Sequence, residues 1–204
     1  MNIIITPLSR GSADIDAALV VLNDSLGAGY VSSADLAAYI APTSTKKLCL
    51  IAKDRTTNAV IGVVTAEIVD AARLRLTLLD NYDAVQHEEP VRRLHDHITG
   101  LIKSVAVVRA ARKNGVGTAL VRQAMEALGQ HGARAFYAIG WITDDAGCHI
   151  QGVLEALRFT PVRRLDRFWY NDSIAHQYDC PQCGRPCRCA AMLLIRTSDT
   201  FPDL

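Results

Sequence analysis

The spacing of apolar positions changes repeatedly along the chain and predicts alternating strands and helices. Short apolar runs between turn residues are typical of buried strands, whereas a 3.6-residue period is typical of a helix that buries one face. Ser12 or Asp14 is expected to cap the first helix, and Ser32 or Ser33 the second. The predicted strands are residues 2–8, 48–53, 60–69, 101–108, 135–142, 162–170 and 190–196, and the predicted helices are residues 15–22, 33–40, 116–128 and 147–158.

The segment 70–100 has the least regular pattern. A brief apolar–polar alternation over 73–78 is followed by a charged stretch, in which a helix is expected from Pro90 to Ile98. His95 and His97 lie near several carboxylates in the sequence and raise the alternative of a metal site. Because residues two apart face different sides of a helix, we interpret this stretch as a solvated polar face.

The most informative stretch is LIKSVAVVRAARKNGVGTAL, which predicts a Val-rich strand, a basic Gly-rich turn and the start of an amphipathic helix. The turn reads Arg112-x-x-Gly115-x-Gly117. Free N–H groups of a first helical turn, the helix dipole and two missing Cβ atoms would therefore coincide, which favours a phosphate or pyrophosphate site. Neither a P-loop nor a dinucleotide fingerprint is present. The alternative is a tight strand–helix connection whose glycines serve packing alone.

This turn resembles the acyl-CoA loop of the GNAT N-acetyltransferases, which reads Gln/Arg-x-x-Gly-x-Gly/Ala between a strand and a helix. The predicted element order resembles that family's as well. The resemblance implies an α/β (α+β) GNAT fold over a single domain, residues 1–204, with a mixed central sheet of about seven strands flanked by about four helices. It also implies acetyl-CoA as co-substrate, with its pantetheine arm on the strand and its pyrophosphate on the turn. The implied binding residues are Val105, Ala106, Val107, Arg112, Lys113, Asn114, Gly115, Val116, Gly117 and Thr118.

The resemblance further implies that an acetyl group passes from acetyl-CoA to an amine acceptor by direct attack in a ternary complex. A backbone N–H of the strand would polarise the thioester carbonyl. Family members often carry Asn-x-x-Ala-x-x-x-Tyr-x-x-x-Gly-Phe after the fifth strand, and this tyrosine usually protonates the departing thiolate. Here Arg158-Phe159 stands in the Gly-Phe place and Leu154 in the tyrosine place, so that acid is missing.

Two side chains are candidates for catalysis. Glu67, late in the third predicted strand, is a candidate general base, and His149, at the start of the last predicted helix, is a second candidate. A water chain that carries the proton is the alternative to a fixed base. The missing tyrosine leaves a second function open, a non-catalytic acyl-CoA-binding domain that uses a cysteine-rich tip to bind a partner protein. The acceptor cannot be identified from the sequence, but we expect residues 70–100 to border its site.

Four of the six cysteines lie close together near the C-terminus, at Cys180, Cys183, Cys187 and Cys189. The Cys-x-x-Cys-Gly half has the form of a zinc knuckle, and the Cys-x-Cys half can supply the other two ligands, unless His176 replaces one. We expect a structural Zn²⁺, because four thiolates leave no open position for catalysis. An iron–sulfur cluster suits the Cys-x-Cys spacing poorly, and four free thiols would be an oxidation liability. The insert, residues 176–190, is expected to form the tip of a hairpin between the last two strands.

Composition narrows the classes of function and the cellular locations that remain possible. Lys and Arg total 22 and Asp and Glu total 21, and the net charge of +1 argues against broad nucleic-acid binding. A nucleic-acid role for the cysteine tip rests only on Arg185 and Arg188. The sequence has no apolar run long enough to cross a bilayer and no signal-peptide pattern, and we expect a cytoplasmic protein with reduced thiols. Cys49 is expected to be a buried core residue. A homodimer is left open.

Overall fold

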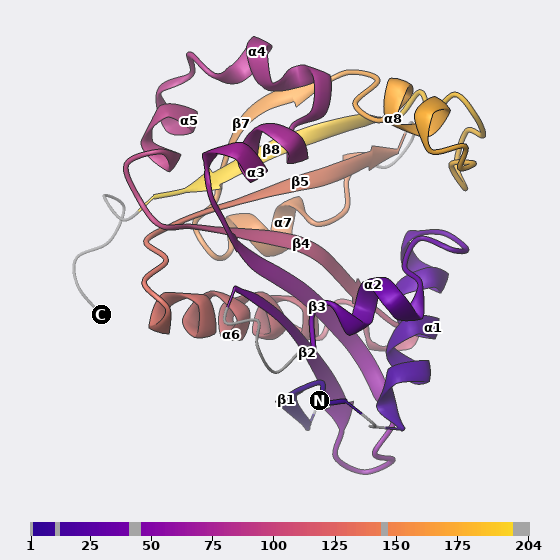
Figure 1. Cartoon of the computed structure of the whole chain (residues 1–204). Helices are drawn as coiled ribbons and strands as arrows, with labels where there is room; N and C mark the ends of the chain where they lie inside the picture. The colour runs from indigo at the N-terminus through magenta and orange to yellow at the C-terminus, as the bar shows by residue number, and fades with distance from the viewer. Residues whose placement is uncertain (1, 11–12, 41–45, 144–146, 198–204) are drawn as a thin grey trace. The chain divides into compact units, whose positions relative to one another are not determined.

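The computed structural model describes residues 2–10, 13–40, 46–143 and 147–197. The chain divides into two compact units, residues 1–68 with 102–131 and residues 69–101 with 132–204. Figure 1 shows the elements in chain order. All eight strands of the described residues belong to one sheet, and β4 (Thr99–Val107) begins in the second unit and continues into the first. Within the described residues, none of the helices is both long enough and apolar enough to span a bilayer.

The first unit is built on neighbouring strands in the order β1, β2, β3, β4. β1 (Ile3–Pro7) pairs with β2 (Lys47–Asp54), and β2 pairs with β3 (Val60–Val69), in both cases antiparallel. Nine of the ten β3 residues are buried, which explains why that strand is an almost continuous apolar run. Cys49 of β2 is 2% exposed, so its predicted burial is confirmed.

Two long helices complete the first unit, α1 (Asp14–Leu26) and α6 (Val116–Gln130). α1 has no side-chain cap and already includes Asp14, so the prediction that Asp14 caps it is wrong; Ser12 lies outside the described residues. The short α2 (Ser33–Ala37) is capped by Ser32, whose hydroxyl accepts from the Asp35 N–H in a capping box. α2 ends before the predicted Ile40, whereas α6 begins at the predicted residue.

α6 packs against β2 and β3 (Figure 1). Its buried face is formed by Val116, Leu120, Val121, Ala124, Met125 and Leu128. Gly62 of β3 permits the close approach, because a Cβ at this position would lie 2.9 Å from Leu120 Cδ1 and 3.2 Å from Val116 Cγ1. The contact with Gly62 therefore sets the distance between the first turn of α6 and β3.

The second unit is built on β8 (Ala190–Arg196), which lies between β5 (Ala135–Thr143) and β7 (Thr160–Leu165) and is antiparallel to both. The two-residue β6 (Gly147–Cys148) pairs with the end of β5. The core of this unit centres on Tyr137, which is fully buried and whose hydroxyl lies 2.6 Å from Thr77 Oγ1.

The segment 70–100 forms short helices that bury side chains in this core. They are α3 (Ala71–Thr77), the 3₁₀ turn η1 (Leu79–Asn81), α4 (Tyr82–Val85) and α5 (Glu89–Leu94). The alternation over 73–78 is not a strand. Asp70 caps α3 by accepting from the Arg73 N–H at 2.8 Å, and Leu74 is buried while Leu76 is 65% exposed. α5 ends at Leu94, four residues before the predicted end.

Two predictions near the end of the chain are wrong. The helix expected from Gly147 is only α7 (Gln151–Glu155), because Gly147 and Cys148 pair with β5 instead. Gly140 of β5 leaves the space that the Cys148 Sγ occupies. The strand expected to reach Tyr170 ends at Leu165, and residues 170–175 form α8 (Tyr170–Ala175). Phe168 and Trp169, which made this stretch look like a strand, are partners in core clusters.

Candidate functional site

The predicted phosphate-binding turn connects β4 to α6 in the first unit. The 3₁₀ turn η2 (Arg109–Ala111) follows β4, and Gly115 is the residue that precedes the first turn of α6. Gly115 has φ 77°, a left-handed conformation that glycine adopts without strain, and nothing lies within 4 Å of where its Cβ would be. Ala119 N–H makes the first intrahelical bond, to Gly115 O at 2.9 Å. The N–H groups of Val116, Gly117 and Thr118 precede it and have no place in the helical ladder.

The basic side chains of this turn have different roles. Arg112 Nε donates to Val107 O at 2.9 Å and so closes the turn onto the end of β4. Asn114 Nδ2 donates to Arg112 O at 3.1 Å. Lys113 is exposed. Its φ of 62° is left-handed, as is the φ of Gly115. The turn therefore presents backbone N–H groups and one exposed ammonium group around an open position.

The strand leading into the turn carries Ser104, one member of a hydroxyl pair that no sequence pattern predicted. Ser104 is buried in β4, and its Oγ lies 3.1 Å from the hydroxyl of Tyr30. Asn23 fixes the neighbouring Val31 through two hydrogen bonds. The Val31 N–H donates to Asn23 Oδ1 at 2.9 Å, and Asn23 Nδ2 donates to Val31 O at 3.0 Å. Burial around its hydroxyl raises the pKa of Tyr30, although 47% of the residue is exposed, so this group stays protonated over the ordinary pH range. Ser104 directly precedes Val105, the first predicted pantetheine residue.

The two candidate catalytic side chains lie in different units. Glu67, in the first unit, has a 3% exposed side chain and lies 3.8 Å from Lys47 Nζ, opposite it in the β2–β3 pair. His149, in the second unit, is exposed, and its Nε2 lies 3.5 Å from Thr143 Oγ1. Leu154, in the place of the family's tyrosine, is fully buried in α7. A catalytic role for Glu67 or His149 stays a prediction.

The four clustered cysteines come together in the second unit. Their Sγ atoms all lie within 4.8 Å of one another, with 3.7 Å for Cys180–Cys189, 3.5 Å for Cys183–Cys189 and 3.9 Å for Cys183–Cys187. Cys180 and Gly184 form an antiparallel bridge, which closes the turn between them, and Gly184 has a φ of 72°. Among the described residues this is the one group that could hold a metal ion. The histidines of the 70–100 segment form no such group there, and His176 pairs instead with Asp172 at 3.1 Å.

The geometry of these sulfur atoms fits a tetrahedral metal. Zn–S bonds of about 2.3 Å place the sulfur atoms of a Cys₄ site about 3.8 Å apart. Although burial opposes it, a hydrogen bond from the Arg188 N–H at 3.1 Å and bonds from the neighbouring thiols hold the pKa of Cys183 below its ordinary value. Burial raises the pKa of the Cys187 and Cys189 thiols, a cost that a bound cation offsets. Trp141 and Trp169 pack against the cluster.

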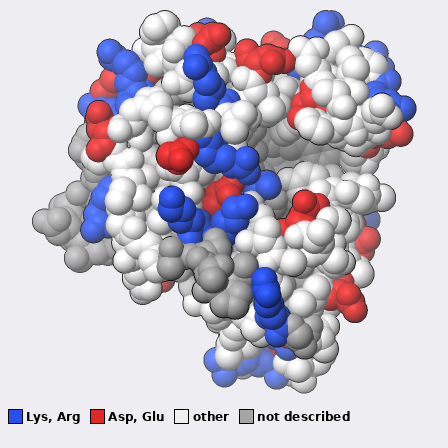
Figure 2. Space-filling model, in the orientation of Figure 1, with Lys and Arg blue, Asp and Glu red and all other residues white. Residues whose placement is uncertain are grey.

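Charged side chains of both signs are interspersed over the face drawn in Figure 2. This agrees with the net charge of +1.

Comparison with known proteins agrees with this geometry. The family model described as the acetyltransferase (GNAT) family matches residues 26–149, which is more than half of the chain. No curated protein sequence matches significantly. Among solved structures, a NatC complex bound to Gag peptide and CoA has a similar chain, with a TM-score of 0.65, 16% identity, and coverage of 97% of this chain and 99% of that one.

Two further structures show the same fold. Arabidopsis thaliana NAA60 in complex with acetyl-CoA has a TM-score of 0.63 and 17% identity, and covers 97% of this chain and 99% of its own. The aminoglycoside 6′-N-acetyltransferase of Enterococcus faecium has a TM-score of 0.62 and 15% identity, and covers 98% and 99%. The predicted α/β fold is therefore confirmed, and the chain belongs to the acetyltransferase (GNAT) family.

Proposed function

We propose that the protein transfers an acetyl group from acetyl-CoA to an amine acceptor, which attacks the thioester directly in a ternary complex. The β4–α6 turn is the observation that carries this proposal. The N–H groups of Val116, Gly117 and Thr118 would bind the pyrophosphate, with the partial positive charge of the α6 N-terminus behind them. Lys113 would meet further phosphate charge. The open position at Gly115 would let the phosphates approach the backbone.

The strand before the turn would bind the rest of the co-substrate. Backbone groups of Val105, Ala106 and Val107 would pair with the pantetheine arm, and one N–H there would donate to the thioester oxygen as negative charge develops on it. Arg112 would support this arrangement indirectly, since it ties the turn to Val107 O. The Arabidopsis structure is in complex with acetyl-CoA and the NatC structure is bound to CoA, and the same ligand class is proposed for this chain.

Proton transfer needs a base for the amine and, where the leaving thiolate is protonated on the enzyme, an acid. Glu67 and His149 remain the proposed bases, with a water chain as the alternative. For the acid, Leu154 offers no proton. Tyr30 is the candidate that replaces it, because its hydroxyl meets Ser104 beside the proposed thioester site and its raised pKa keeps it protonated.

We also propose that the four cysteines hold a structural Zn²⁺. Sulfur separations of 3.5 to 3.9 Å support this ligand set, and a reducing cytoplasm would keep the thiols available. In this proposal residues 1–204 form one acetyltransferase domain and residues 176–190 are its metal-bearing insert. Such a site stabilises the fold around it and takes no part in acetyl transfer.

Calorimetric titration of acetyl-CoA, followed by acetyl transfer to a panel of amines, tests the proposed function. Micromolar binding together with turnover of at least one amine is the expected result. Absence of acetyl-CoA binding by a folded, metal-loaded protein would overturn it.

Binding without turnover would instead support a second candidate function, an acyl-CoA-binding domain whose cysteine tip contacts a partner protein. The buried Leu154 in the tyrosine position favours this reading. The two functions separate cleanly, because only an enzyme releases CoA in proportion to the acceptor consumed.

A further inference from the structure

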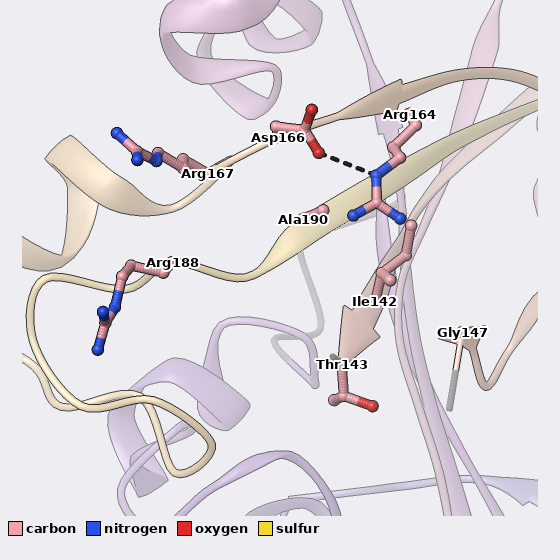
Figure 3. Close-up of a pocket in the computed structure, with 8 residues that line it drawn as sticks. All are labelled: Ile142, Thr143, Gly147, Arg164, Asp166, Arg167, Arg188 and Ala190. Carbon is pink, nitrogen blue, oxygen red and sulfur yellow. Dashed lines mark hydrogen bonds and ion pairs between the residues drawn. The ribbon is translucent and has the colours of Figure 1, made fainter. Parts of the chain in front are cut away.

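A cavity of about 410 Å³ opens in the second unit, where β5 and β7 end and β8 begins. Figure 3 shows the residues that line it. Three of them are arginines and one is a carboxylate. The described lining consists of Ile142, Thr143, Gly147, Arg164, Asp166, Arg167, Arg188 and Ala190.

The charges in this lining do not cancel. Arg164 Nε pairs with Asp166 Oδ1 at 2.9 Å. Within the described part of the chain, no carboxylate forms an ion pair with Arg167 or Arg188. Figure 3 shows Arg164 on one side of Ala190 and the other two arginines on the other side, with their guanidinium groups turned away from Arg164. Arg167 Cζ lies 5.9 Å from the centre of the Tyr170 ring. The lining thus contains two guanidinium groups that no carboxylate of the described residues neutralises.

The cysteine cluster fixes the backbone of two of these arginines. Arg188 lies between two cysteines, and its own N–H donates to Cys183 Sγ at 3.1 Å. The Phe168 N–H donates to Cys189 O at 3.1 Å, which ties the segment that carries Arg167 to the same cluster. Arg167 itself has φ 52°, a left-handed conformation that its neighbours must maintain. The metal-bearing insert thus builds one wall of the cavity.

We propose that this cavity binds the anionic group of a small acceptor, a carboxylate or a phosphate carried by the amine that is acetylated. Guanidinium groups suit either anion, because their planar N–H donors match two oxygen atoms at once. Thr143 adds a hydroxyl to the lining. The identification of the anion as part of the acceptor rests on the proposed acetyltransferase function, whereas the anion site itself does not.

The first experiment measures binding alone, on the full-length, metal-loaded protein. Inorganic phosphate and succinate are titrated separately, with spermidine as a cationic probe. At least one anion should bind, and the Arg167→Gln/Arg188→Gln variant should bind it at least ten-fold more weakly. Arg163→Gln is the matched control, because Arg163 pairs with Glu88 at 2.6 Å and does not line the cavity. Equal affinity in wild type and double variant, absence of anion binding, or binding of spermidine alone would overturn the proposal.

A second measurement keeps the test decisive where the double variant fails to fold. Phenylglyoxal modifies exposed arginines, and the bound anion should slow modification of Arg167 and Arg188 in the wild-type protein while leaving Arg163 unaffected. Peptide mass spectrometry reads each site separately. Unchanged rates at both cavity arginines in saturating phosphate and succinate would contradict the site.

A third experiment, a kinetic comparison of three amines, tests whether the bound anion is part of the acceptor. O-phosphoethanolamine, β-alanine and ethanolamine carry the same primary amine with a phosphate, a carboxylate and no anion. One of the two anionic amines should show at least ten-fold higher kcat/KM than ethanolamine, and the preference should disappear in the double variant with CoA affinity unchanged. Turnover without such a preference, or a loss of CoA affinity, would overturn the assignment to the acceptor. Anion binding without turnover of any amine would count against the acetyltransferase function alone.

Discussion

The hydroxyl of Tyr30 lies 3.1 Å from Ser104 Oγ and joins the α1–α2 connection to the strand that leads into the turn proposed to bind acetyl-CoA. This contact spans 74 positions of sequence. It brings a protonated phenol next to the backbone expected to hold the thioester. Its partner, Ser104, is 6% exposed, so the Tyr30 hydroxyl meets a buried group of β4.

Replacing Tyr30 with Phe should slow acetyl transfer and spare acetyl-CoA binding. If Tyr30 donates a proton to the thiolate, kcat should fall on the order of 10- to 100-fold. Because burial raises its pKa, the wild-type rate should show no alkaline loss from this group near pH 9. Steady-state kinetics from pH 6 to 9.5 checks both points. A variant with wild-type kcat, or one whose loss lies in acetyl-CoA affinity, would remove Tyr30 as the acid.

Replacing Gly117 with Leu should abolish measurable acetyl-CoA binding without unfolding the protein. A side chain in the first turn of α6 would occupy the space proposed for the pyrophosphate, whereas leucine is itself a good helix former. Gly129→Leu is the matched control, because Gly129 lies in the last turns of the same helix with nothing within 4 Å of its Cβ position. Calorimetry and thermal melts measure the two effects. Equal acetyl-CoA affinity in both variants would mean that the turn serves packing alone.

Replacing Cys180 and Cys183 with Ser should remove one zinc per chain. The melting temperature should fall by at least about 5 °C, since metal binding contributes directly to folding. Fluorescence of Trp141 and Trp169 should also change, because both pack against the cluster. Elemental analysis with and without chelator provides the measurement.

Cys148→Ser is the control for the metal experiment, because Cys148 is a free thiol of the same unit outside the cluster. It should keep its zinc and its tryptophan emission. A wild-type protein prepared reduced and with zinc present, yet metal-free and indifferent to chelator, would rule the metal site out.

The stability of the protein should fall in alkali partly through Cys49. Burial raises the pKa of this thiol to about 12 from an ordinary 9.0. Above pH 9 the unfolded chain ionises at this residue and the folded chain does not, so stability that is fully present below pH 9 is lost as the pH rises. The loss from this group should reach about 1.4 kcal/mol at pH 10.

The comparison that isolates this effect is Cys49→Ala. Urea unfolding at pH 8 and pH 10 should show a smaller decline in the variant than in the wild type, by about 1.4 kcal/mol. Equal declines in the two proteins would show that Cys49 ionises as readily when folded as when unfolded.

Local patterns were sufficient to predict the β4–α6 turn and most of the elements. β3, β8 and the start of α6 lie where the apolar spacing placed them, because each buries a face whose period is visible in a few residues. The clustering of the four cysteines was also predicted from the sequence, since they lie close together in it. These features depend on neighbours within about one helical turn or one hairpin.

The missed features depend on contacts that the sequence order does not reveal. The alternation over 73–78 misled because Leu76 is apolar yet exposed, while Asp70 caps a helix there. The helix expected from Gly147 begins later because Gly147 and Cys148 pair with β5. Gly140 of β5 leaves room for the Cys148 side chain in that pairing. The Tyr30–Ser104 pair and the arginine-lined cavity both join residues from separate elements. Single-sequence spacing carries no information about either.

Under the proposed function, Gly62 would influence acetyl-CoA affinity although it lies in β3 and not in the turn itself. Its missing side chain sets how near α6 comes to β3, and the atoms it would meet belong to Val116 and Leu120, at the start of that helix. A methyl group at this position would crowd the side chains of Val116 and Leu120, and any shift of α6 that relieves the crowding would displace the proposed phosphate donors with it. Affinity for the co-substrate would then change although no residue proposed to touch it had been replaced.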